Sequence, residues 1–320
     1  MRCLAGTVRG LLLAAAIASG GQAAAQTVET IKVERESHGN RLSLPVELSL
    51  PKSSAGKVPA IIISHGSGGV RDQREGAYAR AFNGLGVAGV VIDSFTPRGV
   101  RTTVNDQSTV TDADMLADAF AVLKVIAAHP KIDPERIGLI GFSKGGTVAI
   151  KAALRRYRAD AAKDDARFSL LIALYPWCGD MPLDFSPSGA PLHMLLGGDD
   201  TYVGTAACRE YARKFETAGG KLALHVYPGA KHDWDVPGLT AWTERRAQNS
   251  SQCIYEEVQA GKWIERSSGL TTFVNGAPAA DLRKARAHCR TIGASGGYDG
   301  AIAKRSMQDI TAAVRAAFKL

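Results

Sequence analysis

The chain has 320 residues, of which 45% are apolar and 22% are charged, and its formal net charge is +8. This length and composition predict one globular domain with ample length for a hydrophobic core. Lys and Arg are scattered apart from a short patch at residues 155–158, and no RNA- or DNA-binding motif accompanies them, which argues against a nucleic-acid partner.

Residues 1–25 differ in character from the rest of the chain. Two arginines precede an apolar stretch at 11–18, and small residues follow and end in Ala23-Ala24-Ala25. This order predicts a secretory signal peptide that is cut before Gln26. The apolar stretch is too short for a membrane anchor, and no later segment approaches the length of a membrane span. We therefore expect a periplasmic or secreted protein whose single folded domain occupies 26–320.

Four cysteines follow the predicted signal peptide, namely Cys178, Cys208, Cys253 and Cys289. An even number in an exported chain favours two disulfides, and the alternative is a set of free buried thiols. Of the three possible connectivities we expect Cys178–Cys208 and Cys253–Cys289, because each closes the nearer pair. The cysteine spacings match no zinc site, and we expect neither a metal nor another cofactor.

Stretches with strand and helix character alternate along most of the chain. Strands are expected at residues 31–33, 44–50, 58–64, 87–92, 136–141, 168–175, 191–196 and 222–227. Helices are expected at residues 73–86, 112–128, 147–157, 203–218 and 303–318. Such alternation with short loops predicts an α/β fold with a mostly parallel, doubly wound sheet and helices on both faces. Residues 236–297 are polar and rich in Gly and Ser, and they are expected to form an irregular insertion.

A G-x-S-x-G pattern, Gly-Phe-Ser-Lys-Gly-Gly at residues 141–146, lies between a predicted strand and a predicted helix. A strand, a sharp turn that carries Ser and a helix together form a nucleophile elbow. The elbow exposes the Ser hydroxyl, and the flanking glycines let the strand and helix approach closely. The alternative is an ordinary glycine-rich turn in which Ser143 caps the helix.

An acid and a base follow Ser143 in the order of an α/β-hydrolase triad. Asp199 and Asp200 come after one predicted strand, and His232 comes after the last. The carboxyl ends of parallel strands share one edge of the sheet, so the three side chains are expected to meet there. Only one of the adjacent aspartates can orient the imidazole, and from spacing alone either could serve. Asp233 is expected to be solvated or to cap backbone.

Two loops on the same edge offer further site residues. The backbone N–H groups of Lys144 and Ser67 are candidates for an oxyanion hole, Ser67 lying in the His-Gly-Ser-Gly-Gly loop at 65–69. The alternative for that loop is a flexible glycine turn. Arg98, in the loop after the strand at 87–92, is hypothesised to face the pocket and bind a substrate carboxylate, or to position its loop. Its alternative is a surface arginine.

With these motifs in place, residues 40–235 resemble the dienelactone hydrolase family within the α/β-hydrolases. The stretches that carry the resemblance are 65–69, 93–98, 141–146, 197–203 and 229–232. The resemblance implies the α/β-hydrolase fold, and it places the acid on Asp200, the fourth residue of its G-x-x-D stretch. It also implies that Cys178 and Cys208 pair, as in exported members of the family.

The chain departs from the family pattern at three places, one of which is Arg98, a loose match to the arginine with which the family binds its substrate carboxylate. Ser143 stands where dienelactone hydrolases have a Cys nucleophile, and His65-Gly66 stands where they have an activating Glu. These departures favour a general serine esterase that acts on small-molecule esters through an acyl-enzyme. A peptidase or amidase on the same triad, and a non-catalytic binding protein on a hydrolase scaffold, stay open as alternatives. The segment 236–297 has no family counterpart, so it either covers the pocket or is peripheral, and the oligomeric state is open.

Overall fold

The computed structural model describes residues 27–52, 56–162 and 166–320, so the predicted signal peptide lies outside the described residues. The elements in chain order are β1 (Thr27–Ser37), β2 (Asn40–Leu50), β3 (Val58–Ser64), η1 (Asp72–Gly76), α1 (Ala77–Gly84), β4 (Ala88–Ile92), η2 (Thr96–Arg98), α2 (Asp112–Ala127), β5 (Ile132–Phe142), α3 (Lys144–Ala152), α4 (Arg155–Ala162), β6 (Leu170–Leu174), β7 (Asp180–Met181), β8 (Leu192–Gly197), α5 (Ala206–Thr217), β9 (Leu222–Tyr227), β10 (Trp242–Asn249), β11 (Tyr255–Gln259), β12 (Lys262–Glu265), β13 (Thr271–Val274), β14 (Ala277–Pro278), α6 (Leu282–Cys289), β15 (Thr291–Gly296) and α7 (Gly300–Phe318).

An eight-stranded sheet with the order β1-β2-β4-β3-β5-β6-β8-β9 forms the centre of the molecule. The strands from β4 to β9 in this order run parallel to one another, whereas β2 is antiparallel to both of its neighbours. Every residue of β3 is buried, as an unbroken apolar run predicts for a parallel strand that is covered on both faces. The mostly parallel sheet that the alternation predicted is therefore present.

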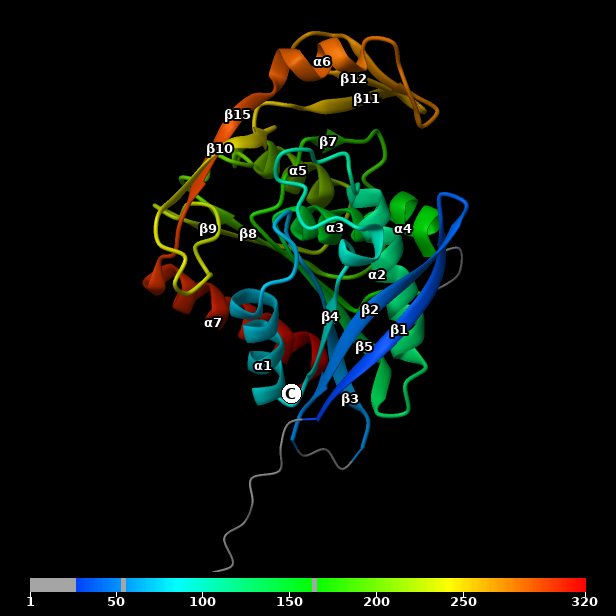
Figure 1. The fold of residues 1–320 in the computed structure, drawn as a ribbon, viewed down its shortest axis with the longest axis vertical. Coiled ribbons are helices and arrows are strands. Elements are labelled where there is room, and N and C mark those ends of the chain that lie inside the picture. Colours follow the sequence, from blue (N-terminus) through cyan, green and yellow to red (C-terminus); the bar gives the residue numbers. More distant parts are fainter. Residues whose placement is uncertain (1–26, 53–55, 163–165) are drawn as a thin grey trace, which may run out of the picture.

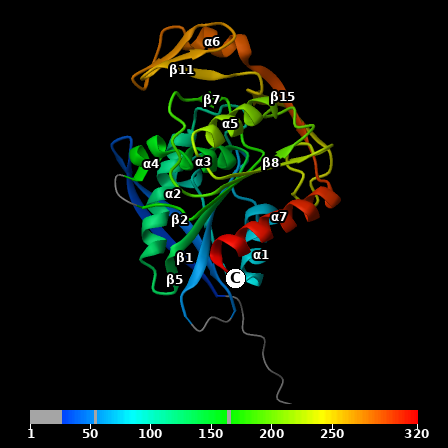
Figure 2. The same ribbon diagram turned by 180° about the vertical axis from the view of Figure 1, so that it is seen from behind.

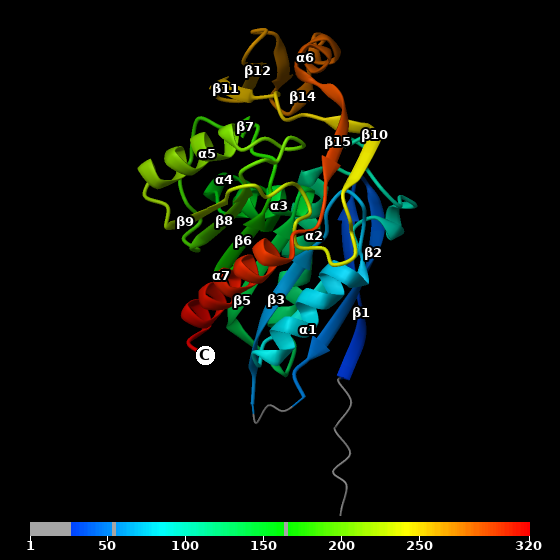
Figure 3. The same cartoon turned by 90° about the vertical axis from the view of Figure 1, so that its left-hand side faces the viewer.

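Helices cover both faces of this sheet, and alternate residues of β3 point to different helices. Ile61 and Ile63 belong to a buried cluster that includes side chains of α1 and α7. Ala60 and Ile62 belong to a second cluster that includes side chains of α2, α3 and α5. Figure 3 shows α1 and α7 together on one side of the sheet. These two layers hold the carboxyl ends of the parallel strands at one edge, where the site residues lie.

The N-terminal hairpin is longer than the sequence pattern indicates. β1 and β2 pair without interruption from Thr27 opposite Leu50 to Ser37 opposite Asn40. The expected strands covered only residues 31–33 and 44–50. Much of β1 is exposed or half-buried, so its residues do not give the clear apolar alternation by which a strand is detected.

Residues 242–296, which we call the cap, contain regular structure where an irregular segment was expected. β10 and β15 form an antiparallel ribbon, and β11 to β14 with β7 form a separate five-stranded sheet beside α6. Figures 1 and 2 show this orange part of the chain at one end of the molecule. Its strands are short and interrupted by glycine turns, so no clear period is visible in the sequence.

Two disulfides join parts of the chain near this end. Cys253–Cys289 ties the start of the cap to the end of α6, and Cys178–Cys208 ties the segment after β6 to α5. These are the two pairs that the sequence favoured. No helix within residues 27–52, 56–162 and 166–320 has the length and apolar character needed to cross a membrane.

The cap leaves and rejoins the main body beside His232. Gly296, the last residue of β15, forms an isolated parallel bridge with His232. The N–H of Gly297 donates to the carbonyl oxygen of His232 at 2.9 Å, and the N–H of Asp299 donates to that of Trp234, also at 2.9 Å. The two ends of the cap, Trp242 and Gly296, also lie opposite each other in the β10–β15 ribbon.

Candidate active site

Ser143 occupies a strained turn between β5 and α3. Its backbone dihedral angles are φ 53° and ψ −112°, a conformation that residues other than glycine rarely adopt. A Cβ on Gly141 would collide with the carbonyl oxygen of Gly145, and a Cβ on Gly145 would collide with that of Ser64. The G-x-S-x-G spacing is thus required by the close approach of strand, turn and helix, which is the geometry of a nucleophile elbow.

Ser143, His232 and Asp200 form a continuous hydrogen-bonded chain. Ser143 Oγ lies 3.0 Å from His232 Nε2, and His232 Nδ1 lies 2.7 Å from Asp200 Oδ2. All three residues are buried. Because Asp200 binds Nδ1, it favours the tautomer whose Nε2 can accept the Ser143 proton.

The geometry separates the two adjacent aspartates. The second carboxylate oxygen of Asp200 accepts hydrogen bonds from the backbone N–H groups of Tyr202 at 2.9 Å and Val203 at 3.2 Å. These bonds fix the carboxylate in the orientation that reaches His232. Asp199 is exposed to solvent. The position that family resemblance implied for the acid is therefore the one that contacts the histidine.

The environment of His232 raises the pKa of its imidazole. Burial by itself would lower that pKa, but the charge and hydrogen bond of Asp200 favour the protonated ring, and the charge of Asp233 adds to them. The rings of Tyr175 and Tyr202 pack against the imidazole at centroid distances of 4.7 and 4.9 Å. These contacts restrict the ring to the orientation seen in the hydrogen-bonded chain.

The two candidate oxyanion donors lie on either side of Ser143. Lys144 is the first residue of α3, so its backbone N–H has no acceptor within the helix. Ser67 lies in the loop after β3, where a Cβ on Gly66 would approach Ser143 Cβ to 3.5 Å. The Ser67 hydroxyl donates to Gln107 Oε1 at 2.9 Å, and Lys144 Nζ donates to the Gln107 carbonyl oxygen at 2.7 Å. Gln107 thus links the side chains of both candidates.

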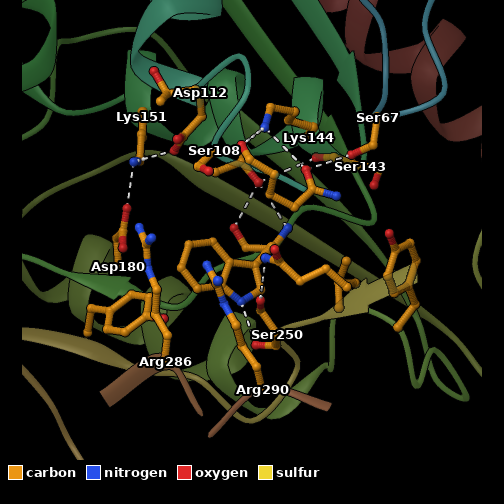
Figure 4. A pocket seen from close by; sticks show the side chains of 18 of the residues that line it. Ser67, Ser108, Asp112, Ser143, Lys144, Lys151, Asp180, Ser250, Arg286 and Arg290 are labelled. Atoms are coloured by element: carbon orange, nitrogen blue, oxygen red, sulfur yellow. Dashed lines mark hydrogen bonds and ion pairs between the residues drawn. The ribbon is translucent and has the colours of Figure 1, made fainter. Parts of the chain in front are cut away.

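Ser143 opens into a cavity of about 300 Å³ between the main body and the cap. Its lining residues are Ser67, Gln107, Ser108, Thr111, Asp112, Ser143, Lys144, Thr147, Lys151, Trp177, Asp180, Tyr202, Val203, Gln248, Ser250, Tyr255, Phe273, Arg286 and Arg290. The last six belong to the cap, so the cap borders this cavity (Figure 4).

Two lysines of α3 line the cavity, and their ammonium groups differ in their partners and in the direction in which their pKa values are shifted. Lys151 Nζ lies between the carboxylates of Asp112 and Asp180, which raise its pKa against the effect of burial. Lys144 has no ion pair within the described ranges, and burial lowers its pKa to about 8. Figure 4 shows Lys151 on one side of the cavity with its two acidic partners and Lys144 close to Ser143.

The structure corrects the expectation that Arg98 faces the pocket. Its guanidinium binds both oxygens of the fully buried Asp118 on α2, at 2.7 and 3.0 Å. It also donates to the carbonyl oxygen of Ser94 at 2.7 Å, and it does not line the cavity. A buried carboxylate requires a partner, and Arg98 together with Arg35 supplies it. The alternative hypothesis, that Arg98 positions its loop, agrees with this arrangement.

Sequence reasoning missed a buried ion-pair network next to His232. Arg74 Nε lies 2.8 Å from Glu75 Oε1, and Arg74 Nη1 lies 3.0 Å from Asp233 Oδ1. The three residues are buried, so Asp233 is neither solvated nor a simple cap as expected. The Arg74 guanidinium also lies 5.0 Å from the centre of the ring of Phe142, the residue that precedes Ser143.

A third buried carboxylate, that of Asp235, completes this network. The hydroxyls of Tyr175 and Tyr78 donate to its two oxygens at 2.7 and 2.8 Å, and burial raises its pKa. No local sequence signal marks these partners, because they are brought together from β6, α1 and the loop after β9. Among the described residues, no group of three or more His, Cys, Asp or Glu side chains could hold a metal ion.

A model of the dienelactone hydrolase family matches residues 44–253 of this chain. Among curated proteins, the chain is 28% identical over 195 residues to an uncharacterised protein of Mycobacterium tuberculosis strain H37Rv, a match covering 57% of this chain and 66% of the relative. It is 23% identical over 205 residues to a probable 2-oxo-3-(5-oxofuran-2-ylidene)propanoate lactonase of Bradyrhizobium sp., covering 61% of this chain and 81% of that protein.

Solved structures show the same architecture. A thermophilic esterase from Thermogutta terrifontis with butyrate bound has a TM-score of 0.52 and 19% identity, covering 66% of this chain and 86% of that one. MGS-M1, an α/β-hydrolase enzyme from a Medee basin deep-sea metagenome library, has a TM-score of 0.52 and 17% identity. The match covers 66% of this chain and 85% of that one. The predicted α/β-hydrolase fold is thereby confirmed, and most of the cap lies beyond the family match.

Proposed function

Since this chain belongs to the dienelactone hydrolase family, we propose that it is a serine hydrolase that cleaves small carboxylic esters. The observation that carries the proposal is the chain from Ser143 Oγ through His232 to Asp200, with successive separations of 3.0 and 2.7 Å. These distances lie within the range in which a base can take the proton of a nucleophile.

In the proposed mechanism His232 Nε2 removes the proton of Ser143 while Oγ attacks the ester carbonyl. The negative charge that develops on the carbonyl oxygen is stabilised by the backbone N–H groups of Lys144 and Ser67, aided by the N-terminus of α3. The protonated His232, oriented by Asp200, then gives its proton to the departing alcohol. Water activated by the same histidine hydrolyses the acyl-enzyme and restores Ser143.

We further propose that the protein acts outside the cytoplasm. Residues 1–25 have the order of a secretory signal peptide, and an oxidising compartment would allow the Cys178–Cys208 and Cys253–Cys289 disulfides to form and persist. On this proposal the mature chain is a single hydrolase domain from Gln26 onward, in which the cap covers the active site.

Labelling of the full chain by a fluorophosphonate probe tests the nucleophile, and a panel of 4-nitrophenyl esters tests the reaction. Wild-type protein should be labelled and should hydrolyse esters, and Ser143→Ala should lose labelling and at least about a thousandfold in kcat/KM. The matched control is Ser250→Ala, which removes a hydroxyl from the cap side of the same cavity. It should remain labelled.

Absence of labelling in the wild type, or equal labelling of Ser143→Ala, would contradict the proposed nucleophile. Peptide 4-nitroanilides run beside the esters separate an esterase from an amidase, because the two substrate classes differ in how strongly the leaving group requires protonation by His232. Faster turnover of the anilides would replace the ester proposal with the amidase alternative.

A further inference from the structure

We propose that Arg286 and Arg290 of the cap form an anion subsite facing Ser143, so that the preferred ester carries a carboxylate or phosphate group. This inference rests on the proposed esterase function and names its substrate class. Both arginines lie beyond residues 44–253, the part that matches the family model, so they belong to this chain's own cap.

The cap holds the two arginines in a defined position. Arg286 lies in the last turn of α6, and Arg290 follows Cys289, which is bonded to Cys253. Both side chains line the cavity that contains Ser143 and are only partly exposed. Figure 4 shows them extending from the cap into the cavity, opposite Lys144 and Ser143.

The positive charge of this pair is not balanced by a protein carboxylate. Neither arginine has an ion pair within the described ranges, and the buried Nε of each has no hydrogen-bond partner there. The charge of Asp106 acts on both arginines, but one carboxylate cannot balance two guanidinium groups, and its oxygens accept from Ser108 rather than from either arginine. Burial lowers the pKa of Arg290 and the charge of Arg286 adds to this effect, whereas Tyr255 and Asp106 oppose it without cancelling it.

The other charged residues of the cavity are two aspartates and two lysines, so they leave the positive charge of the arginine pair unbalanced. Asp112 and Asp180 are both directed at Lys151, which uses them as its own partners. Lys144 contributes a further cation on the nucleophile side. An anion bound between the cap and α3 would therefore meet donors on both sides and no free carboxylate facing it. Arginine forks suit the paired oxygens of a carboxylate or phosphate.

The arginines also stand between two cavities. A second cavity of about 710 Å³, between α6 and the loop that contains Asp106, shares Arg286 and Arg290 with the cavity that contains Ser143. The part of the ester near Ser143 lies beside the aromatic rings of Trp177 and Tyr255. An ester that places its apolar part against these rings and its anionic end at the arginines would span the cavity from Ser143 to the cap.

The test compares matched esters on the full chain. The substrates are mono-4-nitrophenyl adipate, its neutral methyl ester, and the 4-nitrophenyl ester of 5-phosphonopentanoic acid. The readout is the ratio of kcat/KM for each anionic ester to that for the neutral one. Wild-type protein should prefer an anionic ester by about tenfold or more, the scale of a charge-assisted hydrogen bond, and NaCl should reduce the preference. The comparison of carboxylate with phosphonate identifies the anion.

The double substitution Arg286→Gln/Arg290→Gln should bring the ratio close to one, and Arg286→Lys/Arg290→Lys should restore part of it, because charge is kept without the planar fork. The matched control is Arg283→Gln on the same helix, which is exposed and does not line the cavity that contains Ser143. It removes the same charge and should leave the ratio unchanged.

Hydrolysis of the neutral ester with no anionic preference in the wild type would overturn the anion subsite and leave the serine hydrolase proposal standing. An equal loss of preference in Arg283→Gln would also overturn it, because the effect would then come from overall charge. Absence of both hydrolysis and fluorophosphonate labelling would overturn the hydrolase proposal and the subsite with it.

Discussion

At the scale of single residues, the carboxylate of Asp200 determines how strongly His232 holds a proton. Burial opposes the charged imidazole, yet the pKa of His232 is raised above 6.5 because Asp200 lies 2.7 Å from Nδ1. His232 must be unprotonated to act as a base. Because its pKa is raised, the unprotonated form becomes dominant only at higher pH. We therefore predict that kcat/KM for a neutral ester increases with pH through a midpoint above 6.5.

Asp200→Asn should move this midpoint to lower pH, because the charge that favours the imidazolium is gone. It should also lower the plateau rate by roughly a thousandfold to ten-thousandfold, since the amide does not hold the productive tautomer. Asp199→Asn is the matched control, because Asp199 is the exposed neighbour. A pH–rate profile of each variant checks the prediction. A shift in Asp199→Asn with none in Asp200→Asn would reverse the assignment of the acid.

The buried charge on Arg74 contributes to stability through its two acidic partners. Arg74→Met keeps the length of the side chain but leaves the carboxylates of Glu75 and Asp233 without their cation. We predict a loss of about 3–5 kcal/mol in the free energy of unfolding, the cost of breaking a buried pair. Arg80→Met breaks the exposed pair with Asp72, which solvent screens, and should leave the free energy of unfolding almost unchanged.

Urea denaturation followed by tryptophan fluorescence measures both variants. Similar small losses in Arg74→Met and Arg80→Met would show that the buried network does not stabilise the fold. Because Asp233 directly follows His232, Arg74→Met should also reduce the fraction of molecules labelled by a fluorophosphonate under conditions where the protein is folded. That readout separates positioning of the histidine from global stability.

At the scale of the element, the start of α3 depends on the absence of side chains. Gly145→Ala places a methyl group against the carbonyl oxygen of Ser64 at the end of β3. Because backbone cannot move aside as a flexible side chain can, we predict a loss of about 1–3 kcal/mol in stability together with reduced labelling of Ser143. The strain falls on the two elements that present the nucleophile.

Gly84→Ala is the matched control for this substitution. Gly84 is the last residue of α1, its backbone does not have a positive φ, and a Cβ there would meet no atom within 4 Å. It should be neutral or stabilise the protein by up to about 1 kcal/mol through the unfolded state. Thermal unfolding of both variants checks the prediction. Equal effects would contradict a special requirement for glycine at residue 145.

At the scale of the whole molecule, local patterns predicted the central sheet and the order of the site residues. Apolar runs such as β3 and the amphipathic α2 are local signals, and each site residue followed a strand of a parallel sheet. The chain order of Ser143, acid and His232 could be identified because parallel strands end at one edge. Spacing alone did not separate Asp199 from Asp200, since the distinction depends on which carboxylate is held by backbone N–H groups.

The features that the sequence did not reveal depend on pairing between distant residues. Arg98 was expected at the pocket, but its partner Asp118 lies on α2 and was indistinguishable from a surface residue in sequence. Arg74 meets Asp233 across 159 positions of the chain. The short strands of the cap likewise gain stability from each other and from the Cys253–Cys289 disulfide, so no single segment shows a strong periodic signal.

The bridge between His232 and Gly296 bears on how readily the cap can be replaced by a segment of another length. The cap begins and ends at residues that lie opposite each other, Trp242 and Gly296, and it rejoins the main body at His232. The path of the central sheet therefore does not depend on how long the chain between these residues is. A segment attached in this way can be exchanged, lengthened or shortened without altering the path of the strands that present Ser143 and Asp200. Under the proposed function, changes in the cap could then alter which substrate is accepted while the strands that carry the proposed triad keep their path.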